Sequence, residues 1–207
     1  MFQQKVNRSY TSGFAGEISR DGPLRGKVAR IVSETIGTDP AKSTNRVSRV
    51  FGYKGEQGLQ GQTLSARVPE VVVGGASFFG VLFHPKHSVL NGTVSGGPLA
   101  ASYDLPKGYE AEFADMAFLH AEIFNETTAA KDVNYGDTLA YVSTATTAAQ
   151  NPLALPLGAI VSVPAGAQVP DGFSVLPNSK VINPIKGLAA SAAGAVISTV
   201  TEIQMTN

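Results

Sequence analysis

Closely spaced prolines constrain the C-terminal third of the chain more than any other feature. They stand at positions 152, 156, 164, 170, 177 and 184. Because proline lacks a backbone donor and its ring clashes with the preceding helical turn, no helix of ordinary length fits between them. Short apolar runs do fit, and we predict β-strands at 159–163, 180–182 and 195–203.

The middle of the chain continues this pattern of short strands between turn residues. Gly74-Gly75 separates two runs rich in Val and Phe, Asn91-Gly92 is a preferred hairpin pair, and Gly136 supplies a permissive backbone. We predict strands at 65–73 and 76–83, a hairpin at 88–95, and a turn leading into a strand at 131–142.

Three stretches are ambiguous. Residues 27–37 fit a helical face or a strand, and their β-branched side chains favour a strand. Residues 109–124 carry apolar side chains at helical spacing and are rich in Ala and Glu, which favours a helix. Glycine recurs at every third position over 52–61, which cannot sustain a triple helix without proline and predicts a surface loop.

Residues 1–27 are expected to form an extended arm. Apolar side chains at positions 2, 6, 10, 14 and 18 fit a helical face, but Gly13, Gly16, Gly22, Pro23 and Gly26 argue against a helix. Fixing the backbone costs about 1–2 kcal/mol per residue, so such a segment is ordered only against a partner surface. Its extended reach is about 80 Å. A frayed terminus or a first edge strand of the chain's own sheet is the alternative.

The charges are segregated along the chain. Residues 1–67 hold 11 Lys/Arg and 5 Asp/Glu, a net +6, whereas residues 68–207 hold 5 and 11, a net −6. This pattern predicts contact between the two halves, within one subunit or between neighbours. A basic segment could instead touch nucleic acid, but the Lys/Arg residues form no dense cluster, so no nucleic-acid partner is predicted.

Other sequence features exclude several classes of protein. The chain has no cysteine, so disulfides and thiol catalysis are excluded. Lys5 and Arg8 interrupt any apolar leader, and the weakly polar run at 188–200 is too short to span a bilayer. We therefore predict a soluble protein with no membrane partner.

The reactive residues do not form a recognised site. His84 and His87 could bind a metal, but no third ligand stands at a motif spacing, and His120 fits a core histidine. Glu110 and Glu112 would share a strand face like a glycosidase pair, although exposed acids are more often solubilising. No nucleophile motif occurs. We predict no catalytic residue, no metal and no cofactor, and therefore no enzyme.

Short motifs occur at 1–3 (MFQ), 13–18 (GFAGEI), 21–25 (DGPLR), 78–82 (FFGVL) and 134–137 (NYGD), and the C-terminal strand is glycine-rich. Together they resemble the capsid cement (decoration) proteins of tailed bacteriophages. Such proteins sit on the outside of the assembled shell and clamp neighbouring capsomers. The resemblance implies strands of a small barrel at 109–124, and we predict strands there.

The predicted fold is all-β, with mainly short antiparallel strands in a sandwich or small barrel, an extended N-terminal arm and long loops. The expected parts are the arm at 1–27, a β-rich region with loops at 28–104, and a barrel-like or sandwich region at 105–207. Residues 28–207 forming one domain is the alternative to the last two.

The resemblance implies a structural protein of the virion capsid surface, assembled in the host cytoplasm, that bridges neighbouring capsid subunits. Its expected partners are the major capsid protein and neighbouring copies of itself, as a dimer or trimer. The arm residues expected at the capsid interface, as aromatic anchors or charge partners, are Phe2, Tyr10, Phe14, Arg20, Asp21, Pro23, Arg25 and Arg30. A virion-surface adhesin or carbohydrate-binding module is the alternative function.

Overall fold

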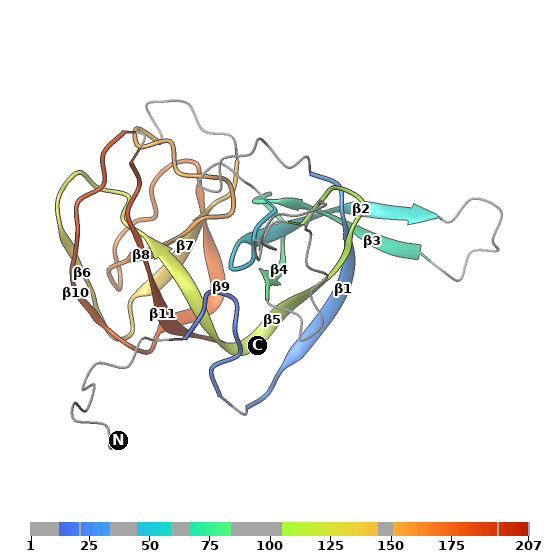
Figure 1. Cartoon of the computed structure of the whole chain (residues 1–207), viewed down its shortest axis with the longest axis horizontal. Helices are drawn as coiled ribbons and strands as arrows, with labels where there is room; N and C mark the ends of the chain where they lie inside the picture. The colour runs from blue at the N-terminus through green and yellow to red at the C-terminus, as the bar shows by residue number, and fades with distance from the viewer. Residues whose placement is uncertain are drawn as a thin grey trace, which may run out of the picture.

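The structure is a computed structural model that describes residues 13–20, 22–33, 45–58, 67–83, 105–144, 151–193 and 195–206. Within these ranges the chain forms eleven β-strands and no helix, so the prediction of an all-β fold is confirmed (Figure 1). The strands are β1 (Arg25–Ile31), β2 (Val50–Gly58), β3 (Arg67–Val73), β4 (Phe78–Leu82), β5 (Glu110–Phe124), β6 (Lys131–Val133), β7 (Thr138–Val142), β8 (Ile160–Val163), β9 (Phe173–Val181), β10 (Ile185–Leu188) and β11 (Ser198–Met205).

Nine strands form one sheet that closes on itself twice. Their order is β1-β3-β2-β4-β5-β11-β9-β7-β8, and further pairings join β1 to β5 and β5 to β8. The first ring therefore consists of β1, β3, β2, β4 and β5, and the second of β5, β11, β9, β7 and β8. Figure 1 shows β5 running between the two groups of strands. The remaining strands, β6 and β10, pair with each other.

β5 belongs to both rings because it is long enough for one half to pair within the first ring and the other half within the second. Residues 110–116 pair with β1, and residues 117–124 pair with β11. Alternate side chains point inward, with Phe113 buried in the first ring and Leu119 and Ile123 buried in the second. The prediction of a strand at 109–124 is thus confirmed.

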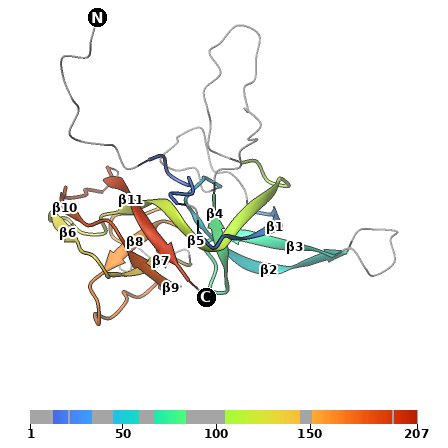
Figure 2. The ribbon, with the colours of Figure 1, turned by 90° about the horizontal axis from the view of Figure 1, so that it is seen from below.

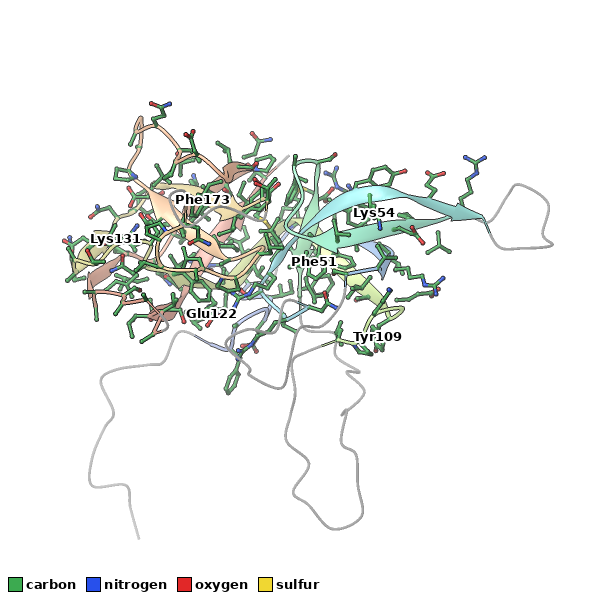
Figure 3. The ribbon with its side chains drawn as sticks, turned by 90° about the horizontal axis from the view of Figure 1, so that it is seen from above. Phe51, Lys54, Tyr109, Glu122, Lys131 and Phe173 are labelled. Atoms are coloured by element: carbon green, nitrogen blue, oxygen red, sulfur yellow. The ribbon has the colours of Figure 1, made fainter. Side chains whose placement is uncertain are left out.

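The helix-like composition of β5 has a packing explanation. Its buried positions include Ala111, Ala117 and Ala121, which are good helix formers on their own. Inside a narrow closed ring, small side chains leave room for large ones from the facing strands. In the first ring, Phe113 fills that space and packs against Phe51, with the two ring centroids 5.0 Å apart. Phe51 lies among the strands of this ring (Figure 3).

The glycine-rich stretch predicted as a surface loop is strand instead for its described residues. β2 continues to Gly58 and pairs with β3 throughout, and the two strands extend away from the rest of the molecule (Figure 2). Gly52 is required by a close approach of backbones, because a Cβ there would lie 2.5 Å from the Gly74 carbonyl oxygen. Tight strand packing thus accounts for Gly52, whereas a Cβ at Gly55 would meet nothing within 4 Å.

The remaining predicted strands each overlap an observed strand where the structure describes them, but β9 starts at Phe173 and continues through Pro177, whereas the strand predicted there covers only 180–182. The runs at 65–73 and 76–83 contain β3 and β4, the run at 27–37 contains most of β1, and Gly136 precedes β7 with φ 82°. β10 had no strand signal in the sequence, and the hairpin predicted at 88–95 lies outside the described residues. No helix among the described residues is long and apolar enough to cross a membrane.

Candidate functional site

The described part of the predicted N-terminal arm lies on the chain's own β5. The N–H groups of Gly16 and Ser19 donate to the carbonyl oxygens of His120 (2.7 Å) and Phe118 (3.0 Å), and the N–H of His120 donates to the carbonyl of Glu17 (2.8 Å). This segment, residues 13–20, appears in dark blue in Figure 1. Residues 22–27 continue into β1, which begins at Arg25, so the expected arm boundary at residue 27 falls inside a strand.

Residues 13–20 cover a part of β5 that no other described strand pairs with on that side. β1 pairs with β5 up to Met116, and β8 begins to pair at Ile123. Between these points Ile18 forms an isolated bridge with Leu119 and packs against the core of the second ring. The segment therefore covers the edge of β5 between the end of its pairing with β1 and the start of its pairing with β8.

A buried carboxylate fixes the end of this segment. Glu202 on β11 is only 3% exposed, and it binds both Nε and Nη2 of Arg20, the latter at 2.6 Å. The hydroxyl of Ser19 donates to the same carboxylate at 2.7 Å, and Asn183 Nδ2 donates at 3.2 Å. The Arg20 hydrogen bond lowers the pKa of Glu202 below its ordinary value, because it stabilises the charged form.

A second buried carboxylate holds β1 in the same way. Asp115 on β5 accepts from Arg25 Nε (2.6 Å) and Nη2 (2.9 Å), and it also binds Lys27. Burial alone would raise the pKa of Asp115, but the hydrogen bonds from Arg25 and Lys27 outweigh it and hold the pKa below its ordinary value. Lys27 also lies over the ring of Phe79, at 5.6 Å from its centroid.

These contacts explain the segregation of charge along the sequence. Arg20–Glu202, Arg25–Asp115, Lys27–Asp115 and Arg49–Glu122 each join a base from residues 1–67 to an acid from residues 68–207. The predicted contact between the two halves therefore occurs within one subunit. Two of the arginines expected at the capsid, Arg20 and Arg25, hold carboxylates of their own subunit.

Two other predicted interface residues face solvent. Phe14 is 72% exposed, and Pro23 is also exposed. Arg30 is half-buried on β1, opposite Glu110 in the β5 register. The predicted interface residues Phe2, Tyr10 and Asp21 lie outside the described residues.

Two exposed apolar side chains in the same stretch are absent from the predicted interface. Leu24 is 49% exposed and Val28 is 54% exposed. Alternation along β1 could have suggested an outward Val28, but the face that it occupies depends on its pairing with Glu112 of β5, which is remote in sequence. Leu24 lies just before the strand, where periodicity gives no signal.

The reactive residues do not converge where the structure describes them. Glu110 and Glu112 are both exposed on β5. His120 lies against Gly13 of the N-terminal segment, and its Nδ1 makes no hydrogen bond. Within the described residues, no three His, Asp or Glu side chains could jointly hold a metal ion. His84 and His87 lie outside those residues.

Comparison with known proteins places these features in a family. A sequence profile described as "Structural cement protein (E217 gp24/Pam3 gp6)" matches residues 2–204. The chain belongs to this family of phage structural cement proteins. The resemblance found in the N-terminal motifs is thereby confirmed, and the family is one of structural proteins of the phage capsid.

A solved structure supports the fold of this cement protein. A chain of "The capsid of Myoviridae Phage XM1" superposes with a TM-score of 0.51 at 12% sequence identity, covering 100% of the cement protein and 98% of that chain. At this identity the likeness concerns the fold. No curated protein sequence matches the chain.

Acid is expected to loosen the N-terminal segment of the cement protein. The pKa of Glu202 is lowered from 4.5, so its contribution to stability is complete above about pH 4.5 and is lost as the pH falls through the folded-state value. Asp115 behaves in the same way from 3.8 downward. The unfolding temperature should therefore decrease as the pH is lowered below about 4.5, and Glu202→Gln should make this decrease smaller.

Asp132 provides the matched control for this titration. Its pKa is also lowered, by Lys186 and the Gly187 amide, but the group is exposed at the surface. Asp132→Asn should therefore leave the acid dependence almost unchanged. An acid profile that Glu202→Gln does not alter would contradict the role assigned to Glu202.

Proposed function

We propose that this cement protein binds the outer surface of a phage capsid and bridges neighbouring capsid subunits through its N-terminal stretch. Membership of the cement family supports a place on the capsid. The major capsid protein is the proposed partner. Neighbouring copies of the cement protein would also touch one another around a symmetry axis, as dimers or trimers, after assembly in the host cytoplasm.

The exposure of apolar side chains near the N-terminus carries this proposal. Among the described residues, seven large apolar side chains are exposed, and three of them are Phe14, Leu24 and Val28. Exposed apolar side chains of this size are available for contact with another protein. Phenylalanine is also enriched at the centre of protein interfaces. We assign Phe14 and Pro23, with Leu24 and Val28 added, to the capsid-facing surface.

The proposed mechanism is mechanical. Residues 1–12 precede Phe14 in the chain, and 12 residues would reach about 40 Å if fully extended. The body would bind one capsid subunit while this arm reaches its neighbour. Many such weak contacts, repeated over a shell, give large combined stability without any single strong interface. The shell would then resist the internal pressure of packaged DNA.

Deletion of residues 1–12 tests this function. Deletion of residues 1–20 would also remove the segment that covers β5 between β1 and β8, so we expect it to destabilise the body. The shorter deletion should leave the β-strands intact, because no described strand includes those residues. We expect it to reduce occupancy on undecorated capsids by at least about tenfold, since the arm contributes one of the two linked contacts. Occupancy is measured by quantitative gel analysis of purified particles.

Two readouts make the test specific. The temperature at which capsids release DNA should rise with the full-length protein and not with the truncated one. Phe14→Ser should reduce occupancy, whereas Tyr135→Ser, at an aromatic of similar exposure near β7, should not. Full decoration by the truncated protein, or decoration that leaves the release temperature unchanged, would refute bridging by the arm.

A further inference from the structure

We propose that Glu202 is a positioning residue that anchors residues 13–20 to the body, so that Phe14 is presented in a fixed position before the capsid is met. This inference rests on the proposed function, because it assigns Phe14 to the capsid contact. The contacts of Glu202 would order the capsid-binding surface already in the free protein. Such ordering would let the exposed phenyl ring bind without a further loss of chain freedom.

The N-terminal segment needs an anchor because its backbone is costly to order. Gly13 and Gly16 both adopt the left-handed conformation, with φ 52° and 84°. Glycine loses more conformational freedom on folding than any other residue. Against that cost, the described backbone of the segment donates and accepts hydrogen bonds with β5 at His120 and Phe118, besides one turn bond of its own. Side-chain contacts must supply the remaining stabilisation.

Glu202 supplies these side-chain contacts from the opposite end of the chain. Its carboxylate lies on β11, beside β5, and it receives both Arg20 and Ser19. Hydrogen bonds to an ionised group are about twice as strong as neutral ones. Arg20 also lies over the ring of Phe118, at 5.4 Å from its centroid, which fixes the direction of its side chain.

The anchored segment begins with a turn, and the side chain of Phe14 is exposed at this turn. The N–H of Glu17 donates to the Phe14 carbonyl oxygen at 3.1 Å, and the N–H of Phe14 donates to the Glu17 carboxylate at 3.1 Å. Gly13 lies against the His120 ring, where a Cβ would come within 2.4 Å of Cδ2. The turn is thereby held on both sides while the phenyl ring stays exposed.

Arg20→Ala in the full-length protein tests this role. Arg20 is half-exposed, so its removal should leave the core packed. We expect the amides of Gly16, Ser19 and His120 to exchange hydrogen about tenfold faster, since hydrogen bonds to a charged group contribute this much. Occupancy on undecorated capsids should fall by a similar factor. Arg20→Lys, which keeps the charge, should restore part of both properties.

Arg25→Ala is the matched control, because Arg25 makes the same two-pronged contact with a buried carboxylate, Asp115. Arg25 lies on β1, which is held by its own backbone pairing with β5. Hydrogen exchange at the amides of Gly16 and Ser19 should therefore not change in Arg25→Ala. Unchanged exchange at these amides in Arg20→Ala would overturn the anchor. Faster exchange with full capsid occupancy would also overturn it.

The anchor and the proposed function can fail separately. If Phe14→Ser and the deletion of residues 1–12 both leave occupancy intact, the proposed function is wrong. If both reduce occupancy while Arg20→Ala changes neither exchange nor occupancy, only the anchor is wrong. A direct Arg20–capsid contact predicts reduced occupancy with unchanged exchange, which likewise rejects the anchor.

Discussion

Replacing Gly158 with alanine is expected to lower the free energy of unfolding by about 3–5 kcal/mol, from backbone strain and steric overlap together. Gly158 has φ 72°, and a Cβ there would lie 2.5 Å from the Val50 carbonyl oxygen and 2.9 Å from Val73 Cγ2. The first contact is with backbone, which cannot move aside. For a chain of this size the loss corresponds to a drop in Tm on the order of 10 °C.

The position of Gly158 explains why the effect should be so large. Its carbonyl oxygen accepts from the N–H of Val50 in the first ring (3.0 Å), and its own N–H donates to Val142 in the second (2.9 Å). Nearby, the Tyr141 hydroxyl donates to the Gly75 carbonyl at 2.9 Å. Gly158 therefore lies in the seam that joins the two rings, and a shift of its backbone disturbs both.

Gly166→Ala is the matched control for this prediction. Gly166 has φ 81°, but a Cβ at that position would meet no atom within 4 Å. Only the backbone strain remains, about 1–2 kcal/mol. Urea or thermal unfolding of the two variants should therefore separate strain from overlap. Equal losses at the two positions would show that the seam tolerates a methyl group.

Much of the strand content could be predicted from local sequence. Glycine and proline mark the ends of β3, β4 and β7, because these residues favour turns and interrupt both regular structures. The closure into two rings could not be predicted in the same way. It depends on β1 and β8 returning to β5, and those pairings join residues far apart in the chain.

The candidate site shows the same division between local and remote information. The exposed Phe14 could be predicted, because a glycine-rich segment has little surface of its own in which to bury a phenyl ring. The partner of Arg20 could not, since Glu202 is 182 positions away in the sequence. Charge segregation indicated that the two halves attract each other, but it did not distinguish partners within the subunit from partners on the capsid.

Arg49→Met is the second substitution with a large expected effect. Arg49 is 1% exposed, its Nη1 lies 3.1 Å from Glu122 Oε2, and its guanidinium lies 4.5 Å from the centroid of the Phe124 ring. Ser198 Oγ donates to the other oxygen of Glu122 at 2.7 Å. Removing one partner of a buried ion pair costs about 3–5 kcal/mol, because the other charge is left uncompensated. Figure 3 marks Glu122 on the shared strand β5.

A double-mutant cycle with Glu122→Gln identifies the cause of that loss. If the uncompensated carboxylate dominates, the double variant should be more stable than the sum of the single losses predicts, by about 1–3 kcal/mol. The exposed pair Arg67–Glu56 is the matched control, and Arg67→Met should cost less than about 1 kcal/mol. Additive losses at Arg49 and Glu122 would instead assign the stabilisation to packing of the arginine side chain against Phe124. The ion pair would then contribute little to holding β5 against the segment before β2.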